Sequence, residues 1–258
     1  MLEVDSSIIG GWIGSMMWPF FRIGAFLLSA PIVGTQLVPQ RVRIVLAFVL
    51  TVILVPHLPP MPVVDAVSIP AFILVAQQLL IGVGLGLILQ VLFQLFVVAG
   101  QMMAMQMGLG FASMVDPTNG VTVTVLSQFH LMLVTLLFLA MNGHLAMIEV
   151  LAESFYALPV GGGFFTSNAL WSLVGWGSWM FTSALLMAIP AMACMLIINF
   201  SMGVVTRAAP QLNIFAIGFP FMLIVGLGIV WVLTSGYLPI FDRYTRQALD
   251  MMAFMVKG

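Results

Sequence analysis

The spacing of the charged residues constrains this chain more than any other feature. Seven Lys and Arg residues and eight Asp and Glu residues are spread over 258 positions, and residues 66–115 and 154–206 contain none of them. A helix needs about 20 apolar residues to cross the hydrocarbon core of a bilayer. Each charge-free interval is long enough for this, so we expect an all-α protein in which long helices meet lipid or other apolar helices.

The composition excludes several classes of protein. Hydrophobic residues make up 62% of the chain and charged residues 6%, with a mean hydropathy of +1.21. Because a soluble domain carries about 25% charged residues, a soluble monomer is excluded. The net charge of −1 without a basic run argues against nucleic-acid binding. The single cysteine, Cys194, cannot form an internal disulfide. The chain is therefore an integral membrane protein or a subunit covered by other apolar chains.

Charges, prolines and glycine clusters divide the chain into apolar segments, which we expect to form one domain over residues 1–258. Residues 1–5 lack the basic start of a signal peptide, so we expect the first segment to be retained. The segments are residues 8–33, 44–56, 70–107, 121–152, 169–206 and 211–238, and an amphipathic tail follows at 240–258.

The segment lengths do not match a plain bundle of six membrane-spanning helices. As helices, residues 44–56 would be only about 20 Å long, and residues 70–107 about 55 Å. Prolines inside apolar runs are expected to kink or break helices, and they occur at Pro19, Pro31, Pro190 and Pro220. Two interpretations remain open: ordinary tilted and kinked spans, or helices that pack into a larger helical assembly.

No set of residues predicts catalysis. His144 and Glu149 do not have the spacing of a zinc-binding helix. Ser178 lacks the following glycine of a nucleophile elbow, and Asp116 has no second carboxylate nearby for acid–base chemistry. The three histidines are better explained as packed, capping or loop residues: His57, His130 and His144. We expect no enzyme, no cofactor and no metal.

One face of the third segment carries amides. Gln90, Gln94 and Gln101 fall within about 40° of one another on a helix. Amides that face hydrocarbon are costly unless they are hydrogen-bonded, so this face should meet protein or water. It either makes hydrogen bonds between helices or forms the polar lining of a conduit. On the same segment, Gly82 and Gly86 permit a close approach of another helix.

A methionine-rich stretch follows that helix. Thioether side chains adapt to irregular surfaces, and five of them stand close together: Met102, Met103, Met105, Met107 and Met114. Gly108, Gly110 and Gly120 allow unusual backbone angles, and Pro117 disfavours helix at Asp116. The stretch is either an ordinary connector or an apolar loop that blocks a pore and moves aside.

Two further features point to partners. Arg22 lies inside an apolar segment and needs an acceptor, for which Glu149 and Glu153 are candidates. We expect Arg22, Glu149 and Arg207 to be paired within an assembly.

The C-terminal tail has the pattern of an amphipathic helix that lies on an interface or docks on a partner. Its apolar residues recur at helical spacing: Phe241, Tyr244, Leu249, Met252 and Met255. Arg246 is four residues from both Asp242 and Asp250, so opposite charges are paired along the helix.

Several stretches, in order along the chain, match a known family: residues 21–26, 30–34, 38–44, 106–117, 138–145 and 207–215. By these stretches the chain resembles the FliR family of flagellar biosynthetic proteins, which is equivalent to the T subunit of type III secretion export gates. The resemblance implies a structural, pore-forming subunit of the flagellar export gate, located in the basal body at the bacterial inner membrane. It implies P-type and Q-type subunits (FliP and FliQ) and the B-type switch protein (FlhB) as partners. Membrane lipid and, transiently, unfolded flagellar proteins would also contact the chain.

The plug loop of the family corresponds here to residues 106–122. The residues expected to form this plug and its hinge are Met105, Met107, Gly108, Gly110, Phe111, Met114, Asp116, Pro117 and Gly120. The alternative function is that of a polytopic secondary transporter of small molecules. That class needs midplane binding groups and a repeat-related pair of broken helices, and we find no repeat and no ion-binding cluster in the sequence.

Overall fold

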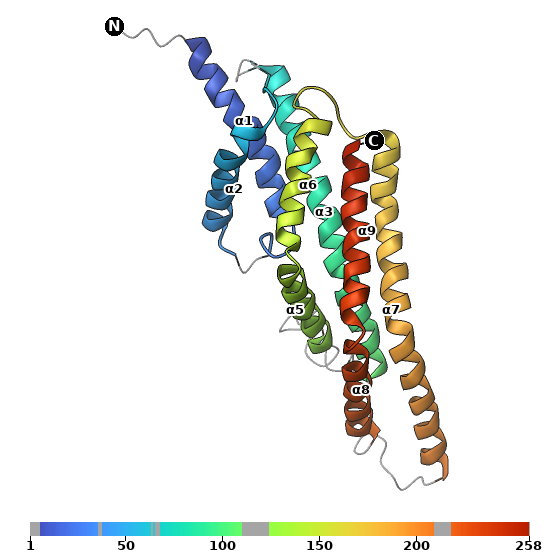
Figure 1. The fold of residues 1–258 in the computed structure, drawn as a ribbon. Helices are drawn as coiled ribbons and strands as arrows, with labels where there is room; N and C mark the ends of the chain where they lie inside the picture. The colour runs from blue at the N-terminus through green and yellow to red at the C-terminus, as the bar shows by residue number, and fades with distance from the viewer. Residues whose placement is uncertain are drawn as a thin grey trace. The chain divides into compact units, whose positions relative to one another are not determined.

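The computed structural model describes residues 6–35, 38–62, 64, 68–109, 124–208 and 218–257, with side chains described from residue 15 onward. Within these ranges the chain is helical and contains no strand (Figure 1), which confirms the all-α class. The helices are α1 (Ser6–Ser29), α2 (Gln40–Leu54), the 3-10 turn η1 (Val55–His57), α3 (Ile69–Gln106), α5 (Val125–Ala140), α6 (Gly143–Ala157), α7 (Ser167–Ala208), α8 (Phe219–Thr234) and α9 (Tyr237–Lys257).

The two longest charge-free segments form the two longest helices. Helix α3 has 38 residues and α7 has 42, close to the predicted bounds of both. Within the described residues, three helices are long and apolar enough to cross a membrane, and up to five if each bent pair is one span. The chain is therefore an all-α membrane subunit.

Two of the expected apolar segments do not coincide with single helices. The apolar segment 121–152 includes two helices, α5 and α6, which meet at a bend of 70°. Asn142 stands at this break with a φ of 57°, a left-handed conformation that asparagine tolerates better than most residues. The boundary expected between segment 211–238 and the tail lies slightly earlier, because α8 and α9 meet at 64° and residues 237–238 already belong to the tail helix.

The four prolines occupy different positions relative to the helices. Pro19 and Pro190 lie inside α1 and α7, and neither helix is broken there. Pro31 comes just after the end of α1. Pro220 lies in the first turn of α8, where a missing amide hydrogen costs little because it has no partner within the helix.

The chain folds as two compact units. Unit 1 comprises residues 1–91, 141–176 and 246–258, and unit 2 comprises residues 92–140 and 177–245. The single domain expected for residues 1–258 stays a prediction.

In unit 1, α1 and α3 approach each other at the level of their backbones. A Cβ atom on Gly82 would lie 2.3 Å from the carbonyl oxygen of Arg22, and one on Gly86 would lie 2.9 Å from the carbonyl oxygen of Phe26. Only glycine allows this separation, which agrees with the close approach expected from Gly82 and Gly86.

In unit 2, aromatic side chains form much of the core. The ring of Phe96 on α3 lies 6.3 Å from that of Tyr237, 5.9 Å from that of Phe241 and 6.2 Å from that of Tyr244, measured between centroids. These contacts fix α9 against the second half of α3.

The amphipathic character expected for residues 240–258 is present in α9. Phe241, Tyr244, Met252 and Met255 are buried, whereas most of its charged residues are exposed, namely Arg243, Arg246, Asp250 and Lys257. The structure thus has an amphipathic helix in this region, and its docking on an interface or a partner stays a prediction.

Candidate functional site

Arg22 is the centre of a buried polar cluster in unit 1. Its side chain is 0% exposed. Nε donates to Oε1 of Gln78 on α3 at 2.7 Å, and Nη1 donates to the carbonyl oxygen of Ser154 at 2.8 Å and to its Oγ at 3.2 Å. Nη2 donates to the carbonyl oxygen of Leu158 at 2.7 Å, and the guanidinium carbon lies 4.1 Å from the centroid of the Phe155 ring. One side chain thus joins α1 to α3 and α6.

The hydrogen-bond acceptors around Arg22 explain how a cation is tolerated in the buried interior of unit 1. Two of them are backbone carbonyls at the C-terminal end of α6, where the helix dipole favours positive charge. The carbonyl oxygen of Ser154 also accepts from the amide of Leu158. Glu149 and Glu153, the expected carboxylate partners, are both exposed. Arg22 is therefore neutralised by dipoles and an aromatic face instead of by either glutamate.

Gln78 was missed by the sequence analysis. The amides singled out there were Gln90, Gln94 and Gln101, but the adjacent Gln77 and Gln78 in the same apolar run carried an equal signal. Gln94 is exposed, and Gln90 and Gln101 are half-buried. This face is thus not sealed within the chain, and its role as conduit lining or as an interhelix contact stays a prediction.

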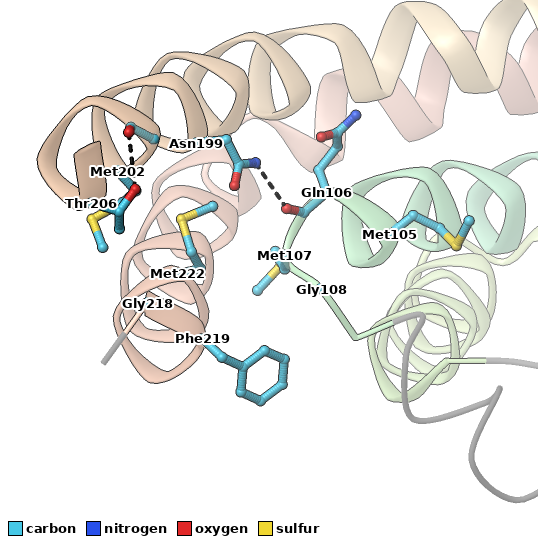
Figure 2. Close-up of a pocket in the computed structure, with 11 residues that line it drawn as sticks. Met105, Gln106, Met107, Gly108, Asn199, Met202, Thr206, Gly218, Phe219 and Met222 are labelled. Carbon is cyan, nitrogen blue, oxygen red and sulfur yellow. Dashed lines mark hydrogen bonds between the residues drawn. The ribbon is translucent and has the colours of Figure 1, made fainter. Parts of the chain in front are cut away.

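A methionine-lined cavity lies in unit 2, where α3 ends. Its volume is about 600 Å³, and Figure 2 shows the residues around it. Met107 after α3, Met202 on α7 and Met222 on α8 come together here from three elements. The remaining lining residues are Met105, Gln106, Gly108, Asn199, Gly203, Thr206, Gly218 and Phe219.

The cavity wall is held by few specific contacts. Asn199 Nδ2 donates to the carbonyl oxygen of Gln106 at 3.4 Å, which links α7 to the end of α3 (Figure 2). Met107 packs against Gly226, where an added Cβ would lie 2.6 Å from the methionine Cγ. Flexible thioethers dominate the lining, so the wall can adapt to a change in what fills it.

Only part of the expected plug stretch can be placed. Met105 is 62% exposed and Met107 is 1% exposed, so the two methionines differ in role. Gly108 has a φ of 81°, the left-handed conformation that glycine adopts readily. The remaining residues of that prediction lie outside the described residues: Gly110, Phe111, Met114, Asp116, Pro117 and Gly120.

A second concavity, a groove of about 570 Å³, lies between α5 and α8 in unit 2. Leu109 and Val125, which flank residues 110–123 in the sequence, both line it. Apart from Thr234, its walls are apolar: Leu109, Val125, Leu126, Phe129, Leu223, Leu227, Val230 and Trp231. Such a surface can receive apolar side chains but supplies no groups for catalysis.

The other predicted charges are at the surface. Glu149 is exposed on α6, and Arg207 is exposed in the last turn of α7, where a cation complements the free helix carbonyls. Across the described residues, no group of three or more His, Cys, Asp or Glu side chains could hold a metal ion.

These features define the class of the protein as an all-α membrane subunit. Comparison with known proteins shows which family within this class it belongs to. The family described as bacterial export proteins, family 1, matches residues 13–248, and the chain belongs to this family. It is not an enzyme family, in agreement with the sequence analysis.

Three relatives of this chain share the name flagellar biosynthetic protein FliR. Flagellar biosynthetic protein FliR of Escherichia coli (strain K12) is 37% identical over 256 residues, which cover 99% of this chain and 98% of the relative. The protein of that name from Pectobacterium carotovorum subsp. carotovorum is 37% identical over 253 residues, 98% of this chain and 97% of the relative. The one from Aquifex aeolicus (strain VF5) is 33% identical over 216 residues, which cover 83% of this chain and 82% of the relative. The resemblance to the FliR family is confirmed.

Proposed function

We propose that this chain is a structural and pore-forming subunit of the bacterial flagellar type III protein export gate. The observation that carries the proposal is the similarity to flagellar biosynthetic proteins FliR along nearly the whole chain. The gate would lie in the flagellar basal body at the inner membrane, and unfolded flagellar proteins would pass through its conduit.

The exposed apolar helices support a role within an assembly. Buried residues make up only 11% of an apolar 18-residue stretch of Gln40–His57 and 28% of one in α7. Surfaces this apolar must be covered by lipid or by other helices. We propose FliP-type and FliQ-type subunits as the helical neighbours and a FlhB-type protein as a further partner.

The plug is the finer part of the proposal. A pore wide enough for an unfolded chain would leak ions unless it is closed at rest, and residues 106–122 are our candidate for the seal. The adaptable methionine-lined cavity and the apolar groove both lie where this stretch begins, so apolar side chains have surfaces to pack on. Each Å² of apolar surface exposed on opening costs about 25 cal/mol, so the closed state would be favoured without a covalent lock.

Co-purification tests membership of the gate. We expect the chain to aggregate or to be degraded when it is expressed alone, because its apolar faces lack cover, and to accumulate when FliP-type and FliQ-type subunits are expressed with it. The measurement is the composition and dispersity of the complex isolated in mild detergent. A stable, monodisperse chain without partners would contradict the proposal.

The same complex tests the plug. Deletion of residues 110–116 should raise the flux of small solutes across membranes that contain the complete gate, at matched amounts of complex. A matched control is the double substitution Asp250→Ala with Lys257→Ala at exposed positions of α9, which leaves residues 106–122 intact. Equal permeability with and without the 110–116 deletion would assign the seal to another subunit and leave gate membership untouched.

A further inference from the structure

A third, smaller cavity in unit 2 adjoins the apolar groove at Val230. Its volume is about 100 Å³, and it shares no lining residue with the methionine-lined cavity. His130 on α5, Pro190 on α7 and Tyr237 on α9 meet there, with Met103 and Leu186 also in the wall. Of this set, Tyr237 also packs against Phe96 in the core of unit 2.

Two of these side chains bring polar atoms that lack a protein partner. His130 is 0% exposed and Tyr237 is 5% exposed. Nδ1 of His130 lies 2.7 Å from the carbonyl oxygen of Leu126, so Nδ1 carries the hydrogen and Nε2 is left as an acceptor. Among the described residues, neither Nε2 of His130 nor the hydroxyl of Tyr237 has a hydrogen-bond partner.

The proline in the wall adds a third polar atom. Inside a helix, the amide of residue 190 would donate to the carbonyl oxygen of Leu186, but Pro190 has no amide hydrogen. That carbonyl is therefore released from the ladder of α7, and Leu186 and Pro190 both line the cavity. In apolar surroundings such a carbonyl is satisfied by a neighbouring side chain or by water.

We infer that this cavity is a water-binding site built from His130, Tyr237 and the carbonyl group of Leu186. The centroids of the His130 and Tyr237 rings lie 5.4 Å apart, so the two side chains are direct neighbours in the cavity wall. A single water can donate to Nε2 of His130 and to the carbonyl oxygen of Leu186 while it accepts from the hydroxyl of Tyr237. With two donated hydrogen bonds and one accepted hydrogen bond, that water gives each of the three polar groups a partner.

The size and lining of the cavity agree with water as the ligand. A water occupies about 30 Å³ in the liquid, so a cavity of about 100 Å³ holds one to about three molecules. The rest of the wall is formed by apolar side chains and holds no carboxylate, so a metal cation has no charged ligand there. Cavities stay dry when their walls are wholly apolar, but here two side-chain groups without a protein partner and the carbonyl released by Pro190 favour water.

X-ray footprinting of the gate in native membranes tests the site. Radicals formed from a bound water oxidise the methionine beside it even when bulk solvent has no access. Met103 lines the cavity and is 3% exposed, and Met195 on α7 is a matched control that does not line it and is 2% exposed. We expect Met103 to be oxidised several-fold faster than Met195.

Variants connect the signal to the three polar groups. The double variant His130→Leu with Tyr237→Phe should lower the Met103 rate to that of Met195. Pro190→Ala restores a helical donor to the Leu186 carbonyl and favours helix, so it should fold and give an intermediate rate. Equal rates for Met103 and Met195 in the unaltered protein would mean a dry or protein-filled cavity and would overturn the inference. A Met103 rate unchanged by Tyr237→Phe and by Pro190→Ala would overturn it as well.

Discussion

Helices α3 and α7 have nearly the same sequence character and opposite surroundings. Both are long and apolar on all sides, with 38 and 42 residues. Buried residues make up 67% of an apolar 18-residue stretch of α3 but only 28% of such a stretch of α7. A helix that is apolar on every side must be covered on every side. Helix α3 finds most of its cover within this chain, whereas α7 depends on lipid or on other subunits.

The glycines of the two helices differ in the same way. On α3, Cβ atoms at Gly82, Gly86 and Gly100 would meet protein atoms at 2.9 Å or less. On α7, Cβ atoms at Gly175, Gly177 and Gly203 would find nothing within 4 Å. The small residues of α3 serve contacts already made in the chain, and those of α7 leave space that a neighbouring helix can use.

The largest expected effect concerns the arginine bonded to α3. Arg22→Met should lower the free energy of unfolding by about 3–5 kcal/mol, because Gln78 and two α6 carbonyls lose their buried donor. Arg207→Met on α7 is the control, and as an exposed substitution it should change stability by less than about 0.5 kcal/mol. The measurement is thermal unfolding of the purified complex in detergent, together with the amount of chain in membranes. Equal stability of the two variants would contradict the view that α3 is covered within this chain and that α7 is not.

A leucine pair gives the next effect. Leu85 on α3 is 0% exposed, and Leu196 on α7 is 62% exposed. Leu85→Ala should cost about 2–5 kcal/mol through lost burial and a residual cavity. Leu196→Ala should leave the stability of the chain itself unchanged but weaken recovery of the complex if a partner covers α7. A stability loss at Leu196 as large as that at Leu85 would show that α7 is covered within the chain.

The smallest effect is expected from a glycine pair. Gly82→Ala forces α1 and α3 apart and should cost about 1–3 kcal/mol. Gly175→Ala on α7 adds a methyl group in open space and should be neutral or stabilise by up to about 1 kcal/mol, because alanine favours helix. Thermal unfolding of both variants side by side checks this. A destabilising Gly175→Ala would instead locate a neighbouring helix at that position.

The sequence predicts what depends on periodicity and charge. The charge-free intervals became α3 and α7, and the alternation of apolar and charged residues in the tail became α9. The bend at Asn142 was not predicted, because it lies within a long apolar segment where one residue decides whether a helix continues.

The partners of Arg22 were missed for a different reason. Glu149 and Glu153 were plausible by charge, but which side of α6 faces α1 is decided by packing among three helices. The same holds for the cavity at His130 and Tyr237, which are 107 positions apart in the sequence. No local pattern connects them, and the released carbonyl of Leu186 becomes relevant only once α7 lies beside them.

The crossing of α1 and α3 has a consequence for how this sequence can diverge. At Gly82 the nearest atom that a side chain would meet is a backbone oxygen, that of Arg22, and the amide nitrogen of Phe26 also lies within 2.9 Å. Most packed pairs can exchange volume, a larger residue on one side being compensated by a smaller one on the other. Here no substitution on α1 removes the obstructing atoms. Compensated pairs of changes should therefore be absent at this crossing among functional descendants, while the open glycines of α7 remain free to vary with whatever partner covers them.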